Sequence, residues 1–111
     1  MINNATAEHY KWGSDCDGWH LLKRDDLSVI EEQMPPGTSE VKHYHQRSRQ
    51  FFFVLSGILT IQFLDSTETL RQFEGVEISP GTQHQVLNNS GEDVRFLVIS
   101  QPRSHGDRVL V

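Results

Sequence analysis

Short apolar runs separated by turn-forming residues make up most of the chain. No window shows the three- and four-residue spacing of apolar positions that an amphipathic helix requires. Turn signals rich in Gly, Pro, Asn, Asp and Ser recur at intervals of roughly 8–12 residues, the spacing typical of all-β sandwiches and barrels. The pattern therefore predicts an all-β fold.

The apolar runs and the turns between them predict the positions of the strands. We expect strands over Trp19–Leu22, Leu27–Met34, Glu40–His45, Gln50–Ser56, Ile58–Leu64, Thr67–Phe73, Val76–Ile78, His84–Asn88 and Val94–Gln101. Gln50–Ser56 and Val94–Gln101 are apolar on both faces, so both of their faces should be covered. Thr67–Phe73 is mostly polar and should lie at the outside of its sheet.

The two ends of the chain are more polar than its middle. We expect residues 1–18 to form an N-terminal arm, residues 19–101 the barrel, and residues 102–111 a C-terminal tail. A chain of 111 residues suits one domain with one hydrophobic core.

Charge and cysteine content exclude several classes of partner. The net charge is −5 and no basic run is present, so we expect neither nucleic-acid binding nor attraction to an anionic membrane. No apolar stretch approaches the ~18 residues of a membrane span, and the first residues do not resemble a signal peptide. Cys16 is the only cysteine, so no intrachain disulfide can form, and a reducing, cytoplasmic location is expected.

One stretch carries the candidate chemistry. It reads Gly37, five residues, His43, one residue, His45, four residues, Gln50, six residues, Gly57. Residues two apart on a strand share a face, so His43 and His45 would direct two imidazoles to the same point. An isolated pair of this kind is more often an ordinary hydrogen-bonding pair, so the surrounding pattern decides its meaning.

A second element, Pro80-Gly81, two residues, His84, three residues and Asn88, completes that pattern. Together the two elements resemble the motifs of the cupin family, which are small double-stranded β-helix (jelly-roll) barrels. The resemblance covers about residues 37–88. Gln50 departs from it, because the family usually has a glutamate there. The sequence around Gln50 and at Ile99–Pro102 is also similar to that of a group of small bacterial cupins.

The resemblance implies a metal centre with His43, His45, Gln50 and His84 as ligands. Three imidazoles suit divalent Fe, Ni, Zn, Mn or Cu. Gln50 would be a neutral, weaker ligand than glutamate and could not act as a general base. The alternative for Gln50 is a residue that bonds a histidine or a water rather than the metal. Three-histidine centres of the family include dioxygenases.

Alternation along Gln50–Ser56 also predicts what surrounds the centre. Phe52 and Val54 share the face of Gln50, and we expect them to line the pocket together with Val86. Phe51, Phe53 and Leu55 face the other way and should pack against a second sheet or a partner. We therefore expect a homodimer, as the family resemblance also implies.

The sequence leaves two functions open and does not identify a substrate. The first is a metal-dependent enzyme, of dioxygenase, isomerase or lyase type, that acts on a small organic molecule. The second is a non-catalytic module that binds a small molecule or a metal, which the lack of an obvious acid or base beside the ligands favours. His105 could reach the barrel mouth, but a solvated tail is the preferred interpretation.

Overall fold

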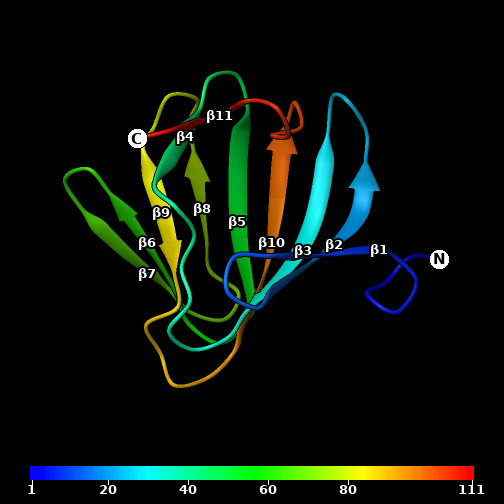
Figure 1. Ribbon diagram of the computed structural model, residues 1–111, viewed down its shortest axis with the longest axis horizontal. Coiled ribbons are helices and arrows are strands. Elements are labelled where there is room, and N and C mark those ends of the chain that lie inside the picture. Colours follow the sequence, from blue (N-terminus) through cyan, green and yellow to red (C-terminus); the bar gives the residue numbers. More distant parts are fainter.

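The computed structural model describes all of residues 1–111 and contains strands as its only regular elements. The six-stranded sheet has the order β1 (Glu8–Trp12), β2 (Cys16–Lys23), β3 (Ser28–Met34), β10 (Val94–Gln101), β5 (Arg49–Ser56) and β8 (Gly75–Ile78). The five-stranded sheet has the order β11 (Arg108–Leu110), β4 (His43–His45), β9 (His84–Leu87), β6 (Leu59–Phe63) and β7 (Thr67–Leu70). All pairings are antiparallel, and Figure 1 shows the two sheets as the walls of one barrel. The all-β expectation is confirmed.

Strand alternation builds the core between the two sheets. Along β10, every second residue from Val94 to Ser100 is buried, and β5 buries Phe52 and Val54 in the same way. The buried apolar cluster is Cys16, Met34, Phe52, Val54, Leu59, Ile61, Leu70, Ile78, Val86, Val94, Phe96 and Val98. Removal of these side chains from water stabilises the contact between the sheets. No helix long and apolar enough to cross a membrane is present.

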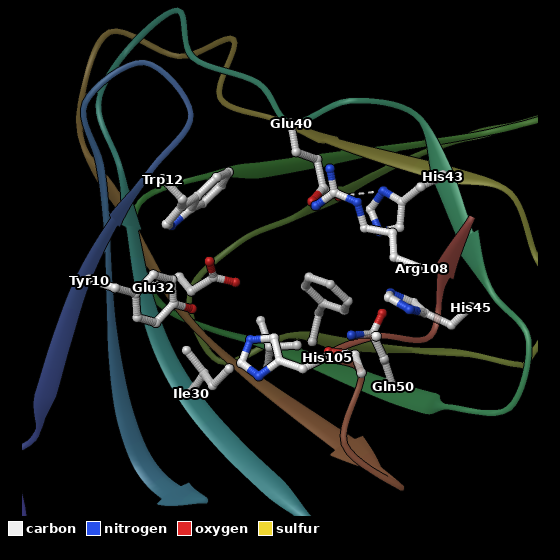
Figure 2. Close-up of a pocket in the computed structure, with 14 residues that line it drawn as sticks. Tyr10, Trp12, Ile30, Glu32, Glu40, His43, His45, Gln50, His105 and Arg108 are labelled. Atoms are coloured by element: carbon white, nitrogen blue, oxygen red, sulfur yellow. Dashed lines mark ion pairs between the residues drawn. The ribbon is translucent and has the colours of Figure 1, made fainter. Parts of the chain in front are cut away.

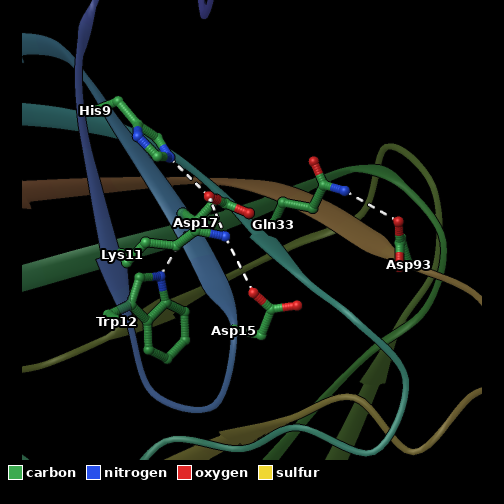
Figure 3. A network of polar contacts seen from close by, with 7 residues as sticks. All are labelled: His9, Lys11, Trp12, Asp15, Asp17, Gln33 and Asp93. Carbon is green, nitrogen blue, oxygen red and sulfur yellow. Dashed lines mark hydrogen bonds and ion pairs between the residues drawn. The ribbon is translucent and has the colours of Figure 1, made fainter.

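The N-terminal segment differs from the expected arm, because Glu8–Trp12 forms β1 at the edge of the six-stranded sheet. Tyr10 and Trp12 face inward, while the outer face of the hairpin carries the polar network of Figure 3. In that network His9 Nε2 lies 2.6 Å from Asp17 Oδ1, and the Trp12 indole N–H donates to the Asp17 carbonyl over 3.1 Å. A short edge strand with one charged face has the composition of a loop, which is why its sequence did not indicate a strand.

The C-terminal tail is also tied to the barrel. Arg108–Leu110 forms β11, in which Arg108 is paired with His45 and Leu110 with His43. Just before it, the Asp107 carboxylate accepts backbone N–H bonds from residues 47 and 48, at 2.9 and 2.7 Å. The segment from 102 to 107 is thereby held across one end of the barrel.

Gly57, which closes β5, offers a test of the packing at this turn. Its φ is +84°, and an added Cβ would lie 2.5 Å from the Asp93 backbone oxygen. Gly37 has a similar φ of +77° with nothing within 4 Å of an added Cβ. We expect Gly37→Ala to lose about 1–2 kcal/mol of unfolding free energy from the left-handed backbone alone. Gly57→Ala should lose at least about 1 kcal/mol more, from the clash with backbone. Urea denaturation measures both, and equal losses would contradict the assigned contact.

Candidate metal centre

Strand pairing brings three histidines from distant parts of the chain together. His43 and His45 lie on one face of β4, and the register of β4 with β9 places His84 directly opposite His43. Ring centroids are 4.9 Å apart for His43 and His45, 4.5 Å for His43 and His84, and 5.9 Å for His45 and His84. One ring nitrogen of each lies within 4.8 Å of the others, and all three side chains are buried. The sequence-predicted cluster is therefore present.

Backbone carbonyls orient two of the rings. His43 Nδ1 lies 2.8 Å from the Val41 carbonyl oxygen, and His84 Nδ1 lies 2.9 Å from the Thr82 carbonyl oxygen. A carbonyl only accepts, so each Nδ1 carries the proton and each Nε2 keeps its lone pair. His84 Nε2 is buried with no hydrogen-bond partner. A buried lone pair without a partner is costly in a protein interior and is what a metal ion would satisfy.

Burial also keeps the three imidazoles neutral. Loss of hydration lowers the pKa of His43 and of His45 to about 4, and it lowers the pKa of His84 as well. Neutral imidazole is the form that binds metals, so the cluster is ready to act as a ligand set across the physiological pH range.

Gln50 joins this cluster from β5 on the opposite sheet. Its amide N–H donates to Ser100 Oγ over 3.1 Å, which fixes the orientation of the side chain. The amide oxygen Oε1 is left buried with no hydrogen-bond partner. Both the three-histidine cluster and this free oxygen fit a divalent metal ion with N and O ligands.

The histidine cluster borders a cavity of about 340 Å³, drawn in Figure 2. Its lining is Tyr10, Trp12, Ile30, Glu32, Glu40, His43, His45, Gln50, Phe52, Val98, Ser104, His105, Gly106 and Arg108. Phe52 lines the cavity. Val54 and Val86 lie in the buried core and not in the lining, because the cavity occupies the end of the barrel nearer Gln50. His84 is not among the lining residues, and its ring lies next to those of His43 and Phe52.

The cavity contains residues that the sequence analysis left out. Tyr10 and Trp12 come from β1, Glu32 from β3, and Arg108 from β11. Glu32 follows Ile30 and precedes Met34 on the inward face of β3, so a charged residue on the apolar face of a strand was the available signal. His105 is solvent-exposed, as preferred from the sequence, and it also borders the cavity, where its ring centroid lies 5.6 Å from that of His20.

The two cavity carboxyls are strongly perturbed. Burial raises the pKa of Glu32 to about 8, and burial together with the nearby Glu32 raises the pKa of Glu40 to about 8. Glu40 Oε1 lies 3.9 Å from His43 Nδ1 and accepts the Val86 backbone N–H over 3.2 Å. Perturbed carboxyls in a cavity are typical of functional sites.

Comparison with known proteins agrees with this geometry. The family model described as Cupin_2, cupin domain, matches residues 30–100. The chain belongs to the cupin family. No curated protein matches this cupin closely enough to count as a relative.

Solved structures share the fold of this cupin at low sequence identity. KdgF from Halomonas sp. has a TM-score of 0.84 at 16% identity, over 93% of this chain and 94% of that chain. The polyketide cyclase RemF from Streptomyces resistomycificus has a TM-score of 0.84 at 19% identity, over 100% of this chain and 84% of that chain. An RmlC-like cupin from Shewanella frigidimarina has a TM-score of 0.83 at 14% identity, over 95% of this chain and 92% of that chain. These likenesses establish the double-stranded β-helix.

The neutral histidines predict an acid sensitivity of the metal-free protein. Between their ordinary pKa of 6.5 and the folded value of about 4, the unfolded chain binds more protons than the folded one. The stability that His43 and His45 contribute is therefore fully present above pH 6.5 and is lost as the pH falls to about 4. In urea denaturation from pH 7 to 4 with a chelator present, the double variant H43N/H45N should lose less stability than the wild type. If the unfolding free energies of the two proteins fell in parallel with pH, the neutral state of His43 and His45 would be contradicted.

Proposed function

We propose that this cupin binds a divalent transition metal through His43, His45 and His84, with Gln50 as a further ligand. The observation that carries the proposal is the buried Nε2 of His84, which has no partner and belongs to a cluster of three neutral imidazoles. The unpaired oxygen of Gln50 supports it, because an amide oxygen with no protein donor is free for a metal. The metal is one of Fe, Ni, Zn, Mn or Cu.

The ligand set has a distinctive charge. Three neutral imidazoles and a neutral amide leave a divalent ion with its full positive charge, whereas a glutamate ligand would reduce it. Such an ion, when bound, supplies Lewis-acid polarisation of a ligand oxygen. Compared with a set that contains glutamate, the neutral set is expected to bind the metal more weakly. The bound ion is expected to polarise a small-molecule ligand more strongly.

We further propose that the cavity holds a small organic molecule beside the metal. Its volume of about 340 Å³ lies at the lower end of the range of ligand pockets, roughly 300–1,000 Å³. Tyr10, Trp12 and Phe52 offer aromatic contact, and Arg108 forms no ion pair in the folded chain. The ionisable groups in the lining favour a metal-dependent enzyme over a purely binding module, since an acid–base group was what the sequence lacked.

Metal content tests the centre directly. The full chain is stripped with a chelator, reloaded with Ni²⁺ and Zn²⁺, and analysed by mass spectrometry and calorimetry. We expect about one metal per chain in the wild type, a loss of at least tenfold in affinity in His84→Ala, and tighter binding in Gln50→Glu because a charged ligand is restored. His105→Ala, at the cavity mouth, is the matched histidine control and should retain metal. Equal affinities in the wild type and His84→Ala would refute the ligand set.

We also propose a homodimer that forms through the outer face of the six-stranded sheet. Phe51, Phe53 and Phe73 form a stacked row there, with centroids 6.4 Å apart at each step. Phe73 is 66% exposed and Phe51 is 40% exposed. Exposed aromatic rows are energetically unfavourable in water and are typical of interfaces.

We propose that the protein is located in the cytoplasm, because its single buried cysteine suits a reducing compartment.

Light scattering coupled to size exclusion tests the dimer. The wild type should elute as a dimer at micromolar concentration, and Phe73→Asp should shift it to a monomer because a charge would be buried in the interface. Leu64→Asp is the control, since Leu64 is similarly exposed, at 73%, in the turn between β6 and β7. A monomeric wild type would overturn the proposal.

A further inference from the structure

Glu32 reaches the cavity from the wall that faces the histidine cluster, as Figure 2 shows. Strand registers pair Tyr10 with Gly18 and Gly18 with Glu32, so the three residues form one row across β1, β2 and β3. A Cβ at Gly18 would lie 2.2 Å from Tyr10 Cζ. The glycine therefore leaves room for the tyrosine ring to cover β2 on the side of Glu32.

The Glu32 carboxyl has no partner in the folded chain, since no hydrogen bond or ion pair involves it. Its sequence neighbour Glu31 makes the contrast clear. Glu31 points to the opposite face of β3, where it pairs with Arg95 and accepts the Asn4 amide N–H over 3.2 Å. Glu32 is half-buried, and partial loss of hydration with no partner to replace it penalises the carboxylate, so the cavity favours the protonated form of Glu32. The raised pKa, about 8, agrees with this environment.

The groups that face Glu32 do not offset its burial. Titratable side chains around the cavity are Tyr10 from β1, Cys16 and His20 from β2, Glu40 before β4, His43 and His45 on β4, and His105 and Arg108 from the C-terminal segment. The cavity residues of β10 and β5 are Val98, Gln50 and Phe52, which are uncharged. Glu40 repels a second negative charge, and Arg108 is the only permanent cation. A positive charge bound at the histidine cluster would therefore shift the protonation equilibrium of Glu32 toward the carboxylate.

We propose that Glu32 is the acid–base group of this cavity and exchanges a proton with a small molecule bound between it and the histidine cluster. The inference rests on the proposed function of the cavity. In the forward step the Glu32 O–H bond breaks, its electron pair stays on the carboxylate, and the proton forms a bond to a hydroxyl or carbonyl oxygen of the ligand. The reverse step returns the same proton, so no oxidant or other co-reactant is needed. A carboxyl whose two forms are both accessible near neutral pH is suited to this exchange.

Infrared spectroscopy of the metal-free full chain tests the protonation of Glu32. Glu40 is removed from the signal by using E40Q as the reference and E32Q/E40Q as the comparison. We expect E40Q to show the carbonyl band of a protonated carboxylic acid at pH 7, with a titration midpoint near pH 8, and E32Q/E40Q to lack it. A midpoint below pH 6 in E40Q, or an unchanged band in E32Q/E40Q, would overturn the proposal.

Addition of Ni²⁺ then tests whether Glu32 responds to charge at the histidine cluster. A divalent ion favours the ionised carboxyl, so E40Q should release more protons on binding Ni²⁺ in weakly buffered solution at pH 7.5 than E32Q/E40Q does. Equal proton release by the two variants would count against Glu32 as the acid–base group. Failure of Ni²⁺ to bind either variant or the wild type would instead refute the metal centre, and the infrared result would still decide the protonation of Glu32.

Discussion

The pairing of β4 with β9 is the contact on which the site depends. Alternation along β4 places His43 and His45 on one face, but the third imidazole comes from a strand about forty residues later in the chain, and only the register that sets His43 opposite His84 brings it to them. A shift of one residue would turn His84 to the other face of the sheet. β11 supports this arrangement from the other side of β4, where it pairs with the histidine strand along its whole length.

Loss of hydration gives the cavity its chemical character. The same physical effect lowers the pKa of the buried histidines and raises the pKa of Glu32 and Glu40, because in each case burial penalises the charged form. Gln50 adds an amide where the family usually has a carboxylate. The metal-free cavity therefore contains polar groups that are mostly neutral at physiological pH, and a divalent ion would be the dominant local charge. A bound ion would therefore interact strongly with the two cavity carboxyls.

The ends of the chain contribute more to the cavity than their composition indicates. β1 supplies Tyr10 and Trp12, the segment before β11 supplies His105, and β11 supplies Arg108. Both are edge strands; β1 pairs with the adjacent β2, whereas β11 pairs with β4, which lies far away in the sequence. Asp107, for example, bonds to backbone N–H groups some sixty residues away in sequence. Local pattern carries little information about such elements.

By itself the sequence determined the all-β fold, the shared face of His43 and His45, and the shared face of Gln50 and Phe52. These follow from strand alternation, which is a local property, whereas the addition of His84 and Gln50 to the site came from the resemblance of the motifs to those of the family. Only the tertiary structure decided that Glu32 faces the histidines, that Val54 and Val86 lie below the cavity, and that His105 lines its mouth. These facts depend on which strands become neighbours and in what register, and non-local pairing determines both. The free lone pair on His84 belongs to the same group, because it depends on which carbonyl its ring meets in the folded chain.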